Sequence, residues 1–183
     1  AYAFRDPATG KPAYWRDVGT LDAYYEANME LLDITPELNL YDKDWPIITD
    51  QPQLPSAKFV HYCNGKRGSA HDSIVSGGCI ISGAELDHVL LFSNVRVEPC
   101  STIRYSVIMP DVSIGEDVHI HRANIDRGCR IESGMQIGIN PDEDRERGFR
   151  ITDKGVVLVT PDMLGQPLHS LRHKSSHTRA ADS

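Results

Sequence analysis

The fold is decided by residues 79–137, which read CIISGAELDHVLLFSNVRVEPCSTIRYSVIMPDVSIGEDVHIHRANIDRGCRIESGMQI. In this stretch a small or apolar residue stands two places before an aliphatic one, eleven times in succession. The second members lie five or six residues apart, which fits neither the three- and four-residue steps of a helix nor the alternation of one strand. The pairs are Cys79/Ile81, Ala84/Leu86, Val89/Leu91, Val95/Val97, Ser101/Ile103, Val107/Met109, Val112/Ile114, Val118/Ile120, Ala123/Ile125, Cys129/Ile131 and Met135/Ile137.

Steps of this length are typical of short strands that turn a corner after each side, as in a hexapeptide parallel β-helix. Three sides make one triangular coil, so the eleven pairs predict slightly fewer than four coils. Inward residues then stack about 4.8 Å apart along the axis, and each buried aliphatic side chain contributes about 1.5–3 kcal/mol. The alternative, a β-rich domain with accidental spacing, fits eleven in-phase pairs poorly. We therefore predict a mainly β protein.

A helix is predicted before the repeat, from about residue 21 to residue 32. Thr20 suits the N-cap and Asp22 lies in the first turn, where a carboxylate complements the helix dipole. Pro36 ends the pattern. One face is marked at steps of three and four residues by Leu21, Tyr24, Tyr25, Asn28, Leu31 and Leu32.

The segments around the repeat differ in character. Residues 33–58 hold four prolines and predict an extended connector. Residues 58–73 predict two short strands around Asn64-Gly65, a strong hairpin signal. Residues 148–160 alternate as a second hairpin, and residues 165–183 predict a polar, mobile tail.

Composition excludes several classes of protein. The net charge of −7 argues against a general nucleic-acid or membrane-surface binder. No apolar run approaches the length of a membrane span, and no signal peptide opens the chain. The four cysteines are scattered without a C-x-x-C pair, which indicates reduced, structural thiols and a cytoplasmic protein. Because the chain begins at Ala1, in a loop-like stretch without Met, we expect a fragment.

Asp17 is the strongest chemical candidate, because it stands on the loop just before a capped helix. That position suits phosphate or metal–phosphate chemistry, and a carboxylate there could ligate Mg²⁺. One aspartate does not complete such a site, and the sequence has neither a G-x-G-x-x-G nor a G-x-x-x-x-G-K-[ST] loop. The alternative is that Asp17 only helps to cap the helix.

Two histidines form a second candidate. His119 and His121 flank inward Ile120, so both are predicted to point outward as solvated surface residues. A histidine base near a coenzyme cleft, as in the hexapeptide acyltransferases that the repeat also resembles, is the alternative for either one. No group of His, Cys or carboxylates has the sequence spacing of a zinc site.

Five motifs, in order along nearly the whole chain, resemble those of bacterial ADP-glucose pyrophosphorylases (glucose-1-phosphate adenylyltransferases). The first is shared with other sugar-nucleotide pyrophosphorylases, whereas the full series is specific to the ADP-glucose enzymes. The motifs are YWRDVGT at 14–20, WPI at 45–47, PSAKFV at 55–60, SGGCIISG at 76–83 and GVVLVT at 155–160.

The resemblance implies how the chain divides. Residues 1–32 would be the C-terminal remnant of an α/β nucleotidyltransferase catalytic domain, with its last helix. Residues 33–72 would be a connector and the start of the β domain. Residues 73–164 would be a left-handed parallel β-helix with a C-terminal hairpin, followed by the tail at 165–183. The handedness follows from the resemblance and not from the spacing.

The resemblance also implies a reaction in glycogen biosynthesis, in which ATP and glucose 1-phosphate give ADP-glucose and pyrophosphate. The sugar phosphate would attack the α-phosphorus in line while Mg²⁺ offsets the developing charge. Asp17 would be one of two metal-binding aspartates, with Trp15 and Arg16 contributing to the substrate site. The second aspartate, the ATP loop and the sugar-phosphate lysine would lie upstream, so the 183-residue chain alone is expected to be inactive.

Family members are homotetramers controlled by small phosphorylated effectors that bind between the two domains. Asp111 and Arg127 match that allosteric site, and a guanidinium suits an effector phosphate. Members that respond to fructose 1,6-bisphosphate carry arginines after the strand at 156–160, where this chain has Pro161 and Gly165. The effector's identity therefore stays open. The alternatives are another sugar-1-phosphate nucleotidyltransferase, a hexapeptide acyltransferase and a non-catalytic assembly module.

Overall fold

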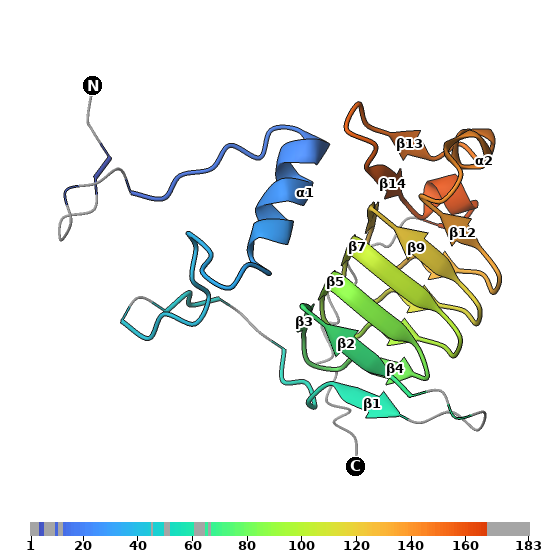
Figure 1. Ribbon diagram of the computed structural model, residues 1–183, viewed down its shortest axis with the longest axis horizontal. Helices are drawn as coiled ribbons and strands as arrows, with labels where there is room; N and C mark the ends of the chain where they lie inside the picture. Colours follow the sequence, from blue (N-terminus) through green and yellow to red (C-terminus); the bar gives the residue numbers. More distant parts are fainter. Residues whose placement is uncertain are drawn as a thin grey trace, which may run out of the picture.

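The protein is a triangular parallel β-helix with one helix packed along its flank (Figure 1). The computed structural model describes residues 4–5, 10, 13–44, 46–49, 52–60, 65 and 67–167. The coils stack from β1 at one end to β12 and β14 at the other, and all pairings between coils are parallel. The hexapeptide left-handed β-helix predicted from the repeat and the resemblance is confirmed.

Each side of the triangle is a ladder of short strands. The first side contains β1 (Lys58–Val60), β4 (Ile80–Ser82), β6 (Arg96–Val97), β8 (Ser113–Ile114) and β11 (Arg130–Ile131). The second contains β2 (Ser69–His71), the first halves of β5 (Glu85–Leu91) and β7 (Thr102–Ile108), β9 (His119–His121) and β12 (Gln136–Ile137). The third contains β3 (Ile74–Val75), the second halves of β5 and β7, β10 (Ala123–Ile125) and β14 (Val157–Val159).

The corners are made by residues with positive φ. Non-glycine residues rarely adopt this conformation, with asparagine and aspartate the most tolerant, so its repetition is a structural requirement of the coil. The corner residues recur every 16 or 17 positions and form three columns: Asp72, His88, Tyr105 and Arg122; Gly78, Asn94, Asp111 and Gly128; Gly83, Cys100, Asp117 and Gly134.

The interior is filled by columns of aliphatic side chains that stack from coil to coil. Leu86, Ile103, Ile120 and Ile137 form one such column. Ten of the eleven predicted pairs point inward as expected.

The pair Val107/Met109 is the exception, and its predicted inward position is wrong. Ser106 and Ile108 point into the solenoid there, whereas Val107 packs outward against the flanking helix. The interior accepts Ser106 because its hydroxyl donates to Arg104 O at 2.7 Å and accepts from Ala123 N at 3.1 Å. Because the flanking helix covers this surface, Val107 is buried although it points out of the solenoid.

The two strands that flank Asn64-Gly65 do not pair with each other, although Gly68 N donates to Val60 O at 3.1 Å across this segment. β1 pairs in parallel with β4, and β2 pairs in parallel with β5, so the two strands belong to different sides of the coil. Residues 61–64, which include Asn64, lie outside the described part of the chain.

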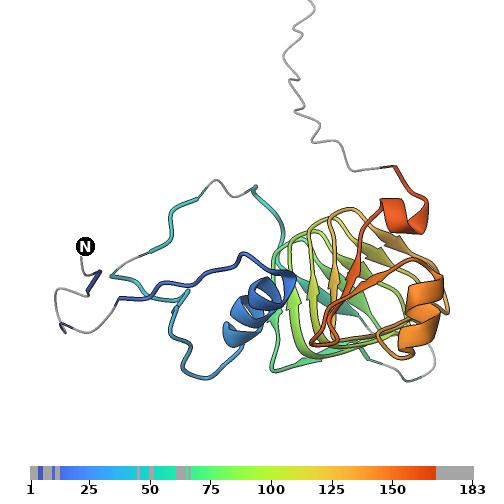
Figure 2. The same cartoon turned by 90° about the horizontal axis from the view of Figure 1, so that it is seen from above.

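The flanking helix α1 (Leu21–Glu30) begins at the predicted N-cap, where Thr20 Oγ1 accepts from Ala23 N at 3.1 Å. It ends two residues earlier than expected. Both views show α1 lying beside the side that carries β5 and β7 (Figure 2). Its buried Tyr25 packs with Leu90 and Val107 on the outward surface of those strands.

The far end of the solenoid is covered by α2 (Pro141–Glu146), the short helix η1 (Asp162–Leu164) and a hairpin. The hairpin predicted at 148–160 is confirmed: β13 (Arg150–Ile151) pairs antiparallel with β14. Buried Phe149 packs into the core at this end. None of the helices in the described residues could span a membrane.

The three described cysteines form no disulfide with one another; Cys63 lies outside the described residues. Cys79 and Cys129 are buried fillers of the interior. Burial is the main reason that the pKa of Cys129 rises to about 12, so this thiol stays protonated and inert at neutral pH.

The register makes a first prediction. Ile120 is 1% exposed, so Ile120→Asp is expected to unfold the β-helix, because an unpaired buried carboxylate costs several kcal/mol. The adjacent substitutions His119→Ala and His121→Ala should change the free energy of unfolding by only about 0.5 kcal/mol. Denaturant titration of the three variants measures this. Similar denaturation midpoints for all three variants would show that the assignment of Ile120 as inward and of the two histidines as outward is wrong.

Candidate functional site

Asp17 lies on an extended loop, residues 13–19, directly before α1. Its Oδ1 accepts a hydrogen bond from Gly19 N at 2.9 Å, which turns the carboxylate back over the loop. Gly19 permits the turn, because a Cβ there would stand only 3.1 Å from that oxygen. Since the Thr20 hydroxyl already caps α1, Asp17 is not the helix cap.

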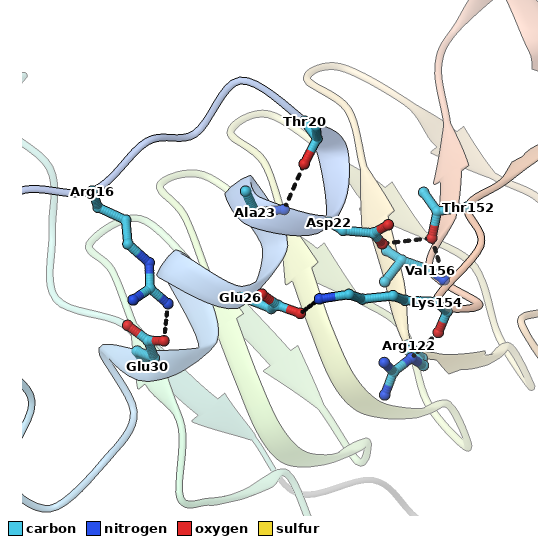
Figure 3. A network of polar contacts seen from close by, with 10 residues as sticks. All are labelled: Arg16, Thr20, Asp22, Ala23, Glu26, Glu30, Arg122, Thr152, Lys154 and Val156. Carbon is cyan, nitrogen blue, oxygen red and sulfur yellow. Dashed lines mark hydrogen bonds and ion pairs between the residues drawn. The ribbon is translucent and has the colours of Figure 1, made fainter.

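The other two predicted substrate residues share this loop. Arg16 forms an ion pair with Glu30, the last residue of α1 (Figure 3). Trp15 is 75% exposed. Among the described residues, no cation pairs with Asp17, so its exposed carboxylate can accept one. This fits a single oxygen ligand for Mg²⁺, which keeps several of its waters in protein sites.

Among the described residues, the loop has no hydrogen bond or ion pair to the solenoid, and α1 links the two. Tyr25 is 5% exposed, and its hydroxyl donates to Tyr105 O at 2.7 Å. Burial raises the pKa of Tyr25, and the nearby Arg122 guanidinium, 5.7 Å from the ring centre, opposes that shift. The helix is thus fixed to the outward surface of β5 and β7 by an aromatic anchor with a satisfied hydroxyl.

Polar contacts join the first two turns of α1 to the tip of the β13–β14 hairpin (Figure 3). Thr152 Oγ1 donates to Asp22 Oδ1 at 2.6 Å, and Lys154 Nζ contacts Glu26 Oε1 at 2.5 Å. The hydrogen bond to Glu26 is the main reason that the pKa of Lys154 is raised. No motif or spacing in the sequence indicates these contacts, because they join residues about 130 positions apart.

Asp111 and Arg127 lie on adjacent coils at one corner of the solenoid. Asp111 is an exposed corner residue, and the equivalent corner one coil later is Gly128, whose N donates to Pro110 O at 3.0 Å. Arg127 therefore stands one coil from Asp111 at the same corner. Asn94, one coil earlier, donates to Asp111 Oδ1 at 3.2 Å.

This corner also lies beside α1. Met109 accepts a hydrogen bond from the Tyr24 hydroxyl at 3.3 Å through its sulfur. Burial raises the pKa of Tyr24, and the charge of Asp126, the residue before Arg127, adds to the shift. The Arg127 guanidinium forms no ion pair or hydrogen bond with any residue that the structure describes. It is available for an anion.

Asn124 is an unexpected polar residue on the outward surface of the third side, where Leu90 and Val107 pack against α1. It lies between Val107 and Leu158 in the outward column of the third side and is 3% exposed. Neither its amide nitrogen nor its oxygen has a hydrogen-bond partner within the described residues. An unsatisfied buried amide costs about 1–3 kcal/mol.

The two histidines of β9 point outward, as predicted. His119 and His121 line a shallow hollow of about 200 Å³, together with Thr102, Arg104 and Gln136. His119 Nε2 is 3.7 Å from Asp117 Oδ1, and the edge of the His121 ring meets Tyr105.

The structure also brings together a group that sequence spacing did not reveal. Asp72, Asp87 and His88 lie at one corner on adjacent coils, with their possible ligand atoms within 4.8 Å of one another. His88 Nδ1 is 2.7 Å from Asp87 Oδ1, and its ring stacks on Tyr105. These contacts account for the position of the imidazole without a metal.

Comparison with known proteins agrees with the resemblance seen in the sequence. The chain matches the family described as "GlmU-like, C-terminal hexapeptide" over residues 55–159. It is 59% identical over 169 residues to a protein of Methylococcus capsulatus, 57% over 175 residues to one of Methylobacillus flagellatus and 56% over 165 residues to one of Nitrosomonas europaea. All three are named glucose-1-phosphate adenylyltransferase.

The alignments cover 92%, 94% and 90% of this chain, so they include α1 as well as the β-helix. The chain spans only 40%, 41% and 38% of these relatives' lengths. The roles assigned to Trp15, Arg16, Asp17, Asp111 and Arg127 stay predictions.

The unsatisfied amide of Asn124, on the surface that α1 covers, leads to a second prediction. Asn124→Val should raise the free energy of unfolding by about 1–2 kcal/mol, because it removes an unsatisfied buried amide and extends the apolar column. The reciprocal change Val107→Asn, in the same column, should lower it. Thermal and denaturant unfolding measure both. A destabilised Asn124→Val protein would show that the amide has a partner in solution, such as a buried water.

Proposed function

Because the chain belongs to the family of GlmU-like, C-terminal hexapeptide proteins and its relatives carry one enzymatic name, we propose that it is part of a glucose-1-phosphate adenylyltransferase. The complete protein would join ATP and glucose 1-phosphate to form ADP-glucose and pyrophosphate, in the cytoplasm, for glycogen synthesis. The observation that carries the proposal is 59% identity over 92% of the chain, across both α1 and the β-helix.

In this proposal Asp17 holds Mg²⁺ with one carboxylate, and Trp15 and Arg16 contact the substrate. The metal, when bound, offsets negative charge on the phosphates. The exposed carboxylate of Asp17 supports this role, and so does the fact that neighbouring Arg16 is paired with Glu30 and does not neutralise it. Arg16 can exchange Glu30 for a phosphate oxygen, since both side chains are partly solvent-accessible.

The β-helix would contribute regulation and assembly. Arg127 would bind the phosphate of a small effector, and Asp111 on the adjacent coil would orient it or accept one of its hydroxyl groups. Two features support this pairing of roles: the Arg127 guanidinium has no partner among the described residues, and the exposed Asp111 lies on the adjacent coil at the same corner. The complete enzyme would be a homotetramer. Pro161 and Gly165 flank η1 where some members carry arginines, so the proposal names only the class of effector.

The catalytic role of Asp17 is tested in the complete enzyme by pyrophosphate release. Asp17→Ala should lower kcat by roughly a hundredfold or more, because transition-state charge loses its metal ligand. The fold should be intact, since Asp17 lies on an exposed loop. Asp33→Ala, another exposed aspartate near α1, is the matched control and should retain activity.

The 183-residue chain alone is expected to form no ADP-glucose in the same assay. Formation of ADP-glucose by the chain alone would refute the proposal that the other parts of the active site lie upstream of these 183 residues. Full activity of the Asp17→Ala enzyme would refute the role of this carboxylate.

The regulatory role is tested by activation curves of the complete enzyme. Arg127→Ala should raise the effector concentration for half-maximal response at least tenfold, about 1.4 kcal/mol, because a charged phosphate contact is lost. Arg130→Ala, an exposed arginine three residues later, should leave the curve unchanged. Superimposable curves for wild type and Arg127→Ala would mean that Arg127 is an ordinary surface residue.

A further inference from the structure

We propose that Thr152 and Lys154, at the tip of the β13–β14 hairpin, are positioning residues that hold the Asp17 loop in place through α1. The inference rests on the proposed function, because it gives the loop a catalytic purpose. It concerns residues of the β-helix that touch neither substrate nor metal.

The first step is that, within the described part of the chain, the loop forms no hydrogen bond or ion pair with the β-helix. The described hydrogen bonds and ion pairs of residues 13–19 run to one another, to Phe4 or to Glu30 on α1. Asp17 itself bonds only to Gly19 within the described chain. The position of its carboxylate relative to the β-helix is therefore set by α1.

The second step is that apolar packing alone does not fix the start of α1. Tyr25, in the middle of the helix, is its only buried side chain. Hydrophobic contact is non-directional and holds the helix against the strands without fixing its rotation or its slide along them. Hydrogen bonds have strict geometry and can fix both. The hydroxyl groups of Tyr24 and Tyr25 also bond to the solenoid, from the middle of α1.

The third step is that the contacts with the hairpin tip add directional bonds in the first two turns, toward the end of α1 nearest Asp17. Asp22 is in the first turn, and its partner Thr152 is part-buried. Glu26, one turn later, pairs with Lys154. Figure 3 shows both contacts reaching from the hairpin tip to the same side of the helix.

The fourth step is that the hairpin tip is itself rigid. The Thr152 hydroxyl accepts from Val156 N at 3.0 Å while it donates to Asp22, which fixes its direction. Gly155 N donates to Thr152 O at 2.9 Å and closes the turn. Arg122 Nε donates to Lys154 O at 3.2 Å and ties the tip to the solenoid. A rigid partner is what a positioning contact requires.

The experiment compares variants of the complete enzyme. Thr152→Val removes the hydroxyl at constant shape, and Lys154→Met removes the exposed amine. Thr152→Ser retains the hydroxyl. Thr160→Val is the matched control, because it breaks a similar contact, Thr160 Oγ1 to Asp162 Oδ1 at 2.5 Å, away from α1. Unfolding midpoints establish that each variant is folded.

Two readouts are taken. Hydrogen exchange of peptides covering residues 13–20 should accelerate at least threefold in Thr152→Val and in Lys154→Met. The Mg²⁺ concentration for half-maximal rate should rise about fivefold, which corresponds to about 1 kcal/mol. Thr152→Ser and Thr160→Val should match wild type in both. A folded Thr152→Val or Lys154→Met enzyme with wild-type exchange and Mg²⁺ dependence overturns the inference.

The two proposals can fail separately. If the wild-type protein forms no ADP-glucose, the proposed function is wrong, and hydrogen exchange of the loop still decides whether the hairpin positions it. If the wild type is active and Asp17→Ala is not, while the hairpin variants behave as wild type, the function stands and the positioning role is refuted.

Discussion

The stacking of inward side chains, one coil directly on the next, is the constraint on which the rest of the structure depends. Because a coil cannot bury its interior face alone, every side must repeat its register, and every corner must accept positive φ. Residues 16 or 17 positions apart become neighbours about 4.8 Å apart. This is why Asp111 meets the coil of Arg127, and Asp72 meets His88, without any local sequence motif.

The outward face of the third side is a second consequence of the same register. Leu90 and Val107 stack on it as regularly as their neighbours do inside, and this gives α1 an apolar surface. The column is interrupted by Asn124, a buried amide without a partner in the described chain. The surface under α1 is therefore less stable than a fully apolar surface would be. The position of α1 then depends more on the polar contacts that Thr152 and Lys154 make with Asp22 and Glu26.

The sequence predicted the repeat, the helix and its cap because each has a local period or a local motif. It misassigned Val107 because two faces of that strand are buried, and a hydrophobic pattern does not distinguish an interior column from one covered by a helix. The Asn64-Gly65 signal is local, so it did not show that β1 and β2 belong to different sides of the coil and pair with β4 and β5. The Asp22–Thr152 bond joins residues 130 apart, which only the folded chain brings together.

Strand β10 connects the two candidate sites. Its three residues are all buried; they pair with β14 along the whole strand and with β7 at Asn124 and Ile125. Arg122 precedes it and contacts both the hairpin tip and the Tyr25 ring. Arg127 follows it by two residues. In the proposed function, the contacts that link the Arg127 corner to Asp17 run along one strand, one hairpin and one helix on the surface of the solenoid. Its close-packed interior, which tolerates little rearrangement, is not crossed.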